Sequence, residues 1–298
     1  MTLYSHAESN TRKTWLLVTG FLIFIIVLGW LFSYLLDSYA ILIIAVIFSV
    51  LMSFSSYWCS DKIVLAMSQA RPIEKKDNPE LYRTVENLCI TAGLPLPRIF
   101  IINEAQPNAF AAGRNAKHAV VALTTGLLEK LDRAELEGVI AHELSHIGNK
   151  DMLLQTIVVI LVGMVAMLSQ LFFRISFFGG GRRDSRGSSG LIMLALGILA
   201  AILAPIAATL IQLSISRKRE FLADASGTLL TRYPEGLARA LEKISKDPTP
   251  LKTANNSTAH LYISNPFRGK QSKNWLTKLF LTHPPTEERV RALRGMKI

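Results

Sequence analysis

Long apolar runs without a charge constrain this chain more than any other feature. Residues 15–36 and 39–58 contain no charged side chain, and only Asp37 and Ser38 separate them. Each run is long enough to cross about 30 Å of hydrocarbon as a helix that rises about 1.5 Å per residue. The first run leads straight into the second and is not typical of a cleaved signal peptide. The sequence therefore predicts an N-terminal transmembrane hairpin.

Residues 152–173 and 191–213 are two further uncharged apolar runs, which predict a second hairpin and about four transmembrane helices in all. Arg12 and Lys13 precede the first run, and Arg217–Arg219 follow the last, so these flanks are expected on the cytoplasmic side. The connector 174–190 opposes this orientation, because it carries four arginines and would lie outside. Either the connector is an exception to the positive-inside rule, or the second hairpin does not fully cross the membrane.

The composition supports a membrane protein and argues against a nucleic-acid partner. Hydrophobic residues make up 50% of the chain and charged residues only 18%, against about 25% charged in average domains. The net charge is +11, and most of the excess lies in residues 214–298 without an interleaved arginine and aromatic pattern. This distribution fits an anionic lipid surface better than DNA or RNA. A basic face that only keeps the protein soluble is an open alternative.

The remaining segments, 59–151 and 214–298, are polar enough to fold in water. We expect a helix ending at Gly93, a helix from Asp132 to about Asn149, and a helix starting at Thr286. Three short strands are expected at residues 98–103, 108–113 and 118–123. The predicted fold class is a mostly α integral membrane protein with a small β-sheet.

The motif His142-Glu143-Leu-Ser-His146 lies on the helix that is expected to run into the third apolar run. Two histidines four residues apart project from one face of a helix and can bind one Zn²⁺ at about 2.0–2.1 Å. Glu143 is then placed to reach a water molecule at the metal. The alternative is a helix with two incidental histidines, but buried imidazoles need partners, and a metal supplies one.

A catalytic zinc needs a third protein ligand and an open position. The metzincin pattern is excluded, because Asn149 and Met152 stand where it needs glycine and histidine. Glu220 and Asp224 share a helix face after the fourth run, so Glu220 could bind the metal and Asp224 could accept a hydrogen bond from a ligating histidine. A straight hairpin would bring Glu220 to the height of His146, both about 9–10 Å above the apolar boundary. An ordinary acidic pair beside the membrane is the alternative.

With these motifs the sequence resembles the HtpX family of membrane-bound zinc metalloproteases, which is related to the CAAX prenyl proteases. The resemblance rests on the two apolar hairpins and on the motifs Asn108-Ala-Phe-Ala, His142-Glu-x-x-His146, Arg219-Glu-Phe-x-Ala-Asp224, Leu261-x-Ile-x-Asn-Pro266 and Thr282-His-Pro-Pro-Thr-x-Glu-Arg289. It implies a gluzincin-type protease with His142, His146 and Glu220 as ligands of one zinc ion per chain and Glu143 as the catalytic residue. It also implies the bacterial inner membrane, an active site facing the cytoplasm, and a role in protein quality control under stress.

The expected chemistry assigns roles to further residues. Zinc held in this way makes water nucleophilic near neutral pH, and Glu143 would take the proton as general base. His283 is a candidate second electrophile, because Pro284 and Pro285 would hold it stiffly and the family shows a histidine there; a surface histidine is the alternative. Asn108, Ala109, Phe110 and Ala111 are expected to form an edge strand that pairs with extended substrate, with a core strand as the alternative.

The sequence thus predicts four segments: a transmembrane hairpin at 1–58, a catalytic segment at 59–151, a second hairpin at 152–213, and a second catalytic segment at 214–298. The predicted function is zinc-dependent hydrolysis of peptide bonds in damaged or misfolded membrane proteins. The predicted partners are protein or peptide substrates and the lipid bilayer, and the sequence gives no prediction of the oligomeric state. The alternatives are a CAAX-type prenyl-peptide protease and a non-catalytic membrane scaffold with a structural metal, although structural zinc normally has four protein ligands.

Overall fold

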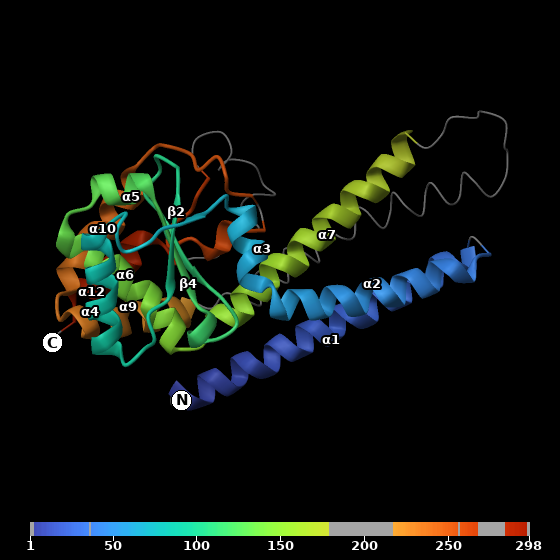
Figure 1. Ribbon diagram of the computed structural model, residues 1–298, viewed down its shortest axis with the longest axis horizontal. Coiled ribbons are helices and arrows are strands. Elements are labelled where there is room, and N and C mark those ends of the chain that lie inside the picture. Colours follow the sequence, from blue (N-terminus) through green and yellow to red (C-terminus); the bar gives the residue numbers. More distant parts are fainter. Residues whose placement is uncertain (1–2, 36, 179–216, 256, 268–283, 297–298) are drawn as a thin grey trace.

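The computed structural model describes residues 3–35, 37–178, 217–255, 257–267 and 284–296. In these ranges the chain is mostly helical and contains one small mixed sheet, as predicted. The elements are α1 (Leu3–Leu35), α2 (Tyr39–Trp58), α3 (Ser60–Met67), β1 (Arg71–Pro72), α4 (Pro79–Ala92), β2 (Arg98–Ile102), β3 (Ala109–Ala112), η1 (Ala116–His118), β4 (Val120–Thr124), α5 (Thr125–Lys130), α6 (Arg133–Gly148), α7 (Met152–Phe178), α9 (Arg217–Thr231), α10 (Pro234–Lys246), η2 (Ala259–Leu261) and α12 (Thr286–Arg294). Figure 1 shows a globular part from which α1, α2 and α7 project together.

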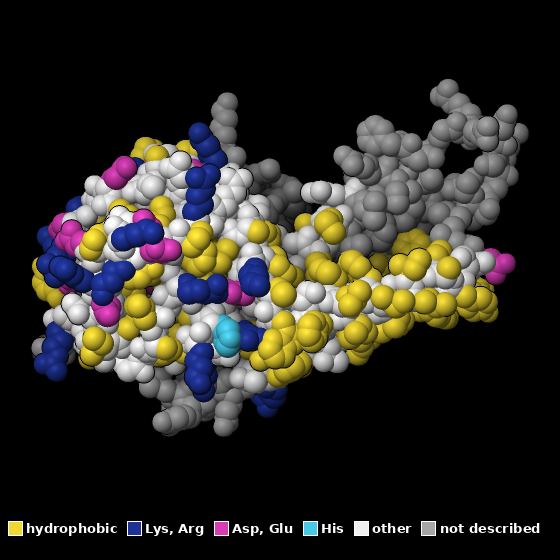
Figure 2. All heavy atoms as spheres, in the orientation of Figure 1, with side chains coloured by type: hydrophobic (Ala, Val, Ile, Leu, Met, Phe, Trp, Pro, Cys, Tyr) yellow, Lys and Arg dark blue, Asp and Glu magenta, His cyan; other side chains and the backbone are white. Residues whose placement is uncertain are grey.

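The projecting helices α1 and α2 form the predicted N-terminal hairpin. Thr11–Tyr34 and Tyr39–Trp58 are both long and apolar enough to cross a membrane. One side of α1 packs against α7, where Phe21 and Ile25 contact a buried row that includes Ile157. The other sides of the hairpin leave large apolar side chains exposed, and Figure 2 shows them as a continuous hydrophobic surface. Because such a surface is stable only in lipid or against another apolar surface, the chain is a membrane protein.

Helix α7 begins the second predicted hairpin, but it does not continue α6. The two helices are bent by 88° at a short break, where Lys150 adopts a positive φ of 57°. The expectation of one helix running straight into the membrane is therefore wrong, and so is the height calculation that assumed it. The described residues contain two helices that can span, or three if the bent pair counts as one span. The fourth run, 191–213, and most of the connector before it lie outside the described residues.

The sheet has the strand order β1-β2-β4-β3, with β2 and β4 parallel and the outer pairs antiparallel. The three predicted strands are confirmed with boundaries shifted by one or two residues. Alternate residues face opposite sides of the sheet. One side carries Ile99 and Val121 against α4, α6 and α10, and the other carries Phe100 and Phe110 against α3 and the segment around Tyr262. Both faces are therefore buried, and α6 lies directly on one of them.

Local signals in the sequence set the helix boundaries around the sheet. Gly93 ends α4 in the left-handed conformation, with φ at 64°. Asp132 and Glu135 form the predicted capping box at the start of α6, because each side chain accepts a hydrogen bond from the other residue's backbone N–H. The predicted start of α12 at Thr286 is also confirmed. The capping box therefore fixes the start of α6, the helix that carries the His142 motif.

Candidate active site

The candidate site lies between α6 and α9, which pack closely side by side. Gly227 of α9 permits this approach, because a Cβ at that position would lie 2.9 Å from the backbone nitrogen of His142. Glu220 lies two turns before Gly227 on the same helix, so close packing at Gly227 brings its carboxylate over the histidines of α6. The two segments are far apart in sequence, and the packing of α9 on α6 brings them together.

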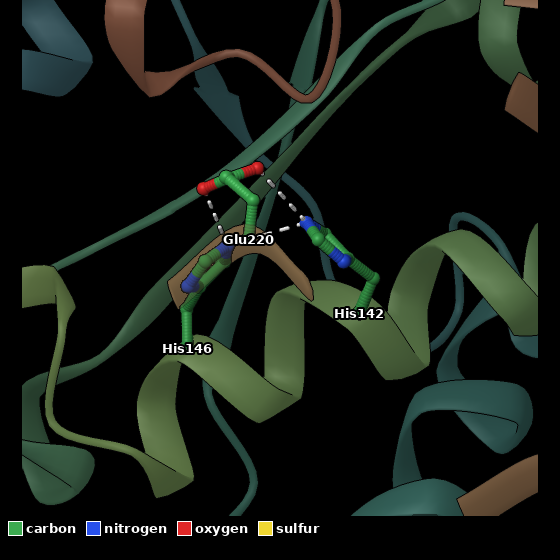
Figure 3. A group of neighbouring side chains, drawn as sticks. All are labelled: His142, His146 and Glu220. Carbon is green, nitrogen blue, oxygen red and sulfur yellow. Dashed lines mark hydrogen bonds and ion pairs between the residues drawn. The ribbon is translucent and has the colours of Figure 1, made fainter. Parts of the chain in front are cut away.

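His142, His146 and Glu220 form one buried group whose ligand atoms all lie within 4.8 Å of one another. The Nε2 atoms of the two histidines are 3.2 Å apart. A carboxylate oxygen of Glu220 lies 3.9 Å from Nε2 of His142, and the other lies 3.6 Å from Nε2 of His146. Figure 3 shows the three side chains converging from α6 and α9 onto one point. The structure therefore brings together the three residues that the sequence predicts as metal ligands.

The far side of each imidazole ring contacts a carboxylate. Nδ1 of His142 lies 2.9 Å from Asp224, as predicted, and Nδ1 of His146 lies 3.3 Å from Asp151. Since an ionised carboxylate can only accept, each Nδ1 donates to its carboxylate, and the two Nε2 atoms face each other. Two nitrogens on one tetrahedral ion lie about 3.4 Å apart, close to the observed spacing. The donor set thus fits a divalent metal, which both Nε2 atoms could bind once His146 has lost its second proton.

Arg289 of α12 lies next to the metal group and binds Asp224. Its Nε and Nη2 donate to the two carboxylate oxygens of Asp224 at 2.8 and 2.6 Å, and its Nη1 donates to the carbonyl of Ile263 at 3.0 Å. Nη1 also lies 3.8 Å from Glu220. The guanidinium is buried and balances two carboxylates, so α12, α9 and α6 are linked through Arg289, Asp224 and His142.

Charge and burial set opposite pKa shifts on the two histidines. Burial lowers the pKa of His142, and the nearby Arg289 adds to this, although Asp224 acts in the opposite direction. Burial alone would lower the pKa of His146 too, but the Asp151 hydrogen bond and the charge of Glu220 raise it to about 9. Burial would raise the pKa of Asp224, but Arg289 outweighs it and holds that pKa at about 2. Asp224 is therefore an anion at every working pH and a steady acceptor for His142.

Glu143 lies beside the metal group and is itself buried. Burial raises the pKa of its carboxyl to about 7, and the charge of Glu220 contributes in the same direction. The backbone of Ala111 on β3 acts in the opposite direction and lowers this pKa in part. A carboxyl with a pKa near neutrality can both accept and release a proton at working pH, which suits the general base predicted from the sequence.

The predicted substrate strand lies on the sheet edge next to the site. β3 is the last strand in the sheet order of the described residues, so it lies at an edge there, but its side chains are buried rather than exposed. The chain's own segment covers one end, because the N–H of Ile263 donates to the carbonyl of Ala109 and the side chain of Asn108 donates to the carbonyl of Ser264 at 3.0 Å. Phe110 packs edge-on against Tyr262. Within the described residues β3 thus lies at the edge of the sheet and also contributes to the core, and its pairing with substrate stays a prediction.

His283 lies outside the described residues. Two buried residues near the metal group were not assigned roles from the sequence, Asp151 and Arg289. Asp151 follows His146 by five residues, and helical spacing alone would point it away; the break before α7 turns it back. Arg289 was included only in the family motif, and its burial could be foreseen only by knowing that α12 packs on α9.

Asp151→Asn is expected to lower metal affinity by about 10- to 100-fold, because asparagine keeps the shape but loses the charge that orients His146. Chelator competition in detergent measures this affinity. Asp247→Asn is the matched control, since Asp247 pairs with Lys130 well away from the histidines. Equal affinities in the Asp151 variant and the parent chain would contradict the role assigned to this carboxylate.

Comparison with known proteins gives a consistent result. The model of peptidase family M48 matches residues 75–297. A protease HtpX homolog of Caldanaerobacter subterraneus subsp. tengcongensis is 43% identical over 100% of this chain and 99% of its own length. Another, of Syntrophobacter fumaroxidans, is 49% identical over 86% of this chain and 89% of its own. The crystal structure of S. mikatae Ste24p matches with a TM-score of 0.48 and 20% identity, over 98% of this chain and 66% of that one. The chain therefore belongs to peptidase family M48 and is a membrane metallopeptidase.

Proposed function

We propose that the chain is a zinc-dependent endopeptidase of the bacterial inner membrane, with one zinc ion per chain and an active site that faces the cytoplasm. The observation that carries the proposal is the convergence of His142, His146 and Glu220 beside the buried carboxyl of Glu143. Two imidazoles and one carboxylate are a typical ligand set of catalytic zinc, which keeps one position open. The observed Nε2 spacing of 3.2 Å fits two imidazoles on one tetrahedral ion, the usual geometry of zinc.

Zinc, when bound, would lower the pKa of water and polarise the scissile carbonyl. The protein's own residues supply the proton transfers. Glu143 takes a proton from the attacking water and passes it to the leaving amine, for which a pKa near 7 is well placed. Asp224 and Asp151 hold the histidine rings by their Nδ1 atoms, and Arg289 holds Asp224. His283 remains the proposed second electrophile.

Substrate is proposed to bind in extended form along β3, in the predicted strand Asn108–Ala111, at the Ala111 end that the segment around Ile263 leaves uncovered. Helix α6, which carries Glu143, packs against β3, and the backbone of Ala111 influences the pKa of the Glu143 carboxyl, so a peptide paired with β3 would pass the reacting groups. Ala109 and Ala111 have small side chains that permit close approach. The proposed substrates are damaged or misfolded membrane proteins, which offer extended segments at the membrane surface.

The segment boundaries follow from the same proposal. Residues 1–58 would form the first membrane hairpin and residues 152–213 the second, which makes four spans. Residues 59–151 and 214–298 would together build the catalytic part, since α6 and α9 come from these two segments. The basic flanks at Arg12, Lys13 and Arg217–Arg219 support a cytoplasmic location for that part.

Glu220→Gln is expected to reduce bound zinc from about one per chain to a small fraction and to abolish hydrolysis, because an amide is a poor ligand for zinc. Metal analysis of detergent-purified protein and casein hydrolysis with and without chelator measure both. Glu242→Gln is the control, since Glu242 is a partly exposed glutamate that pairs with Arg294. Full zinc content together with full activity in the Glu220 variant would refute this assignment.

The two alternatives give different results in the same preparation. A prenyl-peptide protease would cleave a prenylated C-terminal peptide and leave an unfolded membrane protein intact, whereas the proposed endopeptidase cleaves the latter. A structural metal would need a fourth protein ligand, and the described residues offer a group of three. The ligand count therefore favours catalysis.

A further inference from the structure

A cavity of about 200 Å³ lies at the junction between the globular part and the membrane helices. Its walls come from the start of α1, from the loop before η1, and from the turn between α6 and α7. The lining includes Thr11 and Thr14 of α1, Arg114 and Asn115 of the loop, and Lys150 of the turn. The site that was proposed for peptide hydrolysis uses none of these residues, so the cavity needs an explanation of its own.

The cavity lies at the level where the bilayer is expected to begin. Thr11 is the first residue of the first candidate span, and Met152, also in the lining, is the first residue of α7. Trp15 and Trp58 mark the same level, and their side chains are exposed, as is typical of aromatic residues at a membrane interface. Figure 2 shows Lys and Arg side chains on the globular part where the apolar surface of α1 and α2 begins.

The charge of the lining is of one sign. Arg114 and Lys150 are cations, and none of the described residues that line the cavity is acidic. Arg12 and Lys13 are exposed beside Thr11 and Thr14. The rest of the lining includes the apolar side chains of Leu94, Ile147, Met152 and Leu153. A lining that combines cations with apolar side chains matches the chemistry of a phospholipid, which carries an anionic phosphate next to its acyl chains.

The loop that carries Arg114 is held rigidly. Gly113 has a φ of 135°, and a Cβ there would lie 2.4 Å from the carbonyl oxygen of His118, so the tight turn needs glycine. The N–H of Gly113 donates to the hydroxyl of Thr156 on α7 at 3.2 Å. Arg114 then stacks over Trp58 at 4.3 Å and contacts His118 at 2.8 Å. The guanidinium is thus fixed at the cavity before any ligand binds, which reduces the entropy lost on binding.

From these observations we propose that the cavity binds the phosphate-bearing headgroup of an anionic membrane phospholipid. Its volume lies below the ~300 Å³ at which pockets for whole drug-sized molecules begin, so it suits a headgroup whose acyl chains remain in the bilayer. The occupant is a lipid rather than a free anion, because the apolar side chains of the lining and the spans beside them continue the site into the membrane. Ile147 and Gly148 follow His146 directly, so the bound headgroup would brace the end of α6 that carries a candidate metal ligand.

The test uses the full chain in a neutral detergent, titrated with phosphatidylglycerol, phosphatidylcholine or inorganic phosphate, with bound ligand counted by native mass spectrometry. The variant Arg114→Gln with Lys150→Gln removes both cations. The control Lys246→Gln with Arg291→Gln removes two exposed cations from α10 and α12, on the side of the globular part away from the membrane helices (Figure 1). The readout is binding alone, so it does not depend on the proposed peptidase activity.

We expect phosphatidylglycerol to bind the parent chain and the control variant alike, and the Arg114 and Lys150 variant about thirtyfold more weakly, since each cation near an anionic surface contributes about 1 kcal/mol. Arg114→Lys with Lys150→Arg should restore most of the affinity, because both charges are kept. Equal binding of phosphatidylglycerol and phosphatidylcholine, or no difference between the two glutamine variants, would overturn the proposal. Inorganic phosphate binding as tightly as the lipid would also overturn it, because the site would then be one for a free anion.

Discussion

Glu143→Gln is expected to reduce peptide hydrolysis by at least about 10²- to 10⁴-fold while the chain keeps its metal. Glutamine has almost the same shape as glutamate but cannot accept a proton from water, so the loss is that of general-base catalysis. Hydrolysis of casein, measured beside the zinc content of the same sample, tests this. In the parent chain the activity should decrease as the pH is lowered and the Glu143 carboxyl becomes protonated. The midpoint should lie at or below pH 7, because the pKa of this carboxyl is about 7 and a bound cation lowers it further.

The same substitution should stabilise the metal-free protein. The pKa of Glu143 is raised from 4.5 to about 7 by burial, so the folded state binds the proton more tightly than the unfolded state. The parent chain therefore loses stability as the pH rises from about 4.5 to 7, by on the order of 3 kcal/mol. The Glu143→Gln chain lacks this loss, and thermal unfolding in chelator at pH 8 should show the variant to be the more stable, with the difference vanishing below about pH 4.5.

Glu137→Gln is the matched control, because Glu137 lies on α6 and pairs with Arg133 away from the metal group. It should change neither activity nor the pH dependence of stability. Full hydrolysis by the Glu143 variant at normal zinc content would rule out this carboxyl as the base. A catalytic carboxyl that destabilises the metal-free folded protein is consistent with selection for function rather than for stability.

Much of this architecture can be predicted from the sequence, because it depends on local patterns. The first hairpin follows from two uncharged runs, the start of α6 from the capping pair Asp132 and Glu135, and the strands from short apolar runs between turn residues. The proximity of Glu220 to the histidines is also predicted from the sequence, because His146 and Glu220 flank the two ends of one predicted apolar hairpin. Its geometric reason was wrong, since it assumed that α6 runs straight into the membrane.

What could not be predicted depends on how distant segments pack. The break between α6 and α7 has no proline, and its turn relies on Lys150 in a positive-φ conformation, for which a lysine gives no signal. That break is what turns Asp151 back to His146. The cover over β3 comes from a polar segment around Ser264 that carries no strand pattern. In both cases tertiary contacts decide the outcome, and local propensity does not contain them.

The largest effect on stability is expected at Arg289. Arg289→Met keeps an unbranched side chain of similar length but leaves Asp224 buried without its partner, and removes the cation beside Glu220. Loss of one partner from a buried ion pair costs about 3–5 kcal/mol, so the midpoint of thermal unfolding should fall by about 10 °C. The fall should be larger in chelator than with zinc, because a bound divalent cation compensates part of the unbalanced negative charge.

Arg294→Met on the same helix separates this from a general loss of charge on α12. Arg294 makes ion pairs of good geometry with Glu235 and Glu242, but all three side chains are partly exposed, by 45%, 37% and 35%, so its removal should cost about 1 kcal/mol or less. Combining Arg289→Met with Asp224→Asn should recover most of the lost stability, because no unpaired charge then remains between them. It should not recover zinc affinity, since an asparagine accepts a weaker hydrogen bond from His142. Equal destabilisation by the Arg289 and Arg294 variants would mean that the buried ion pair contributes no more to the free energy of unfolding than the exposed pairs do. Helix α12 would then stabilise the fold by packing alone.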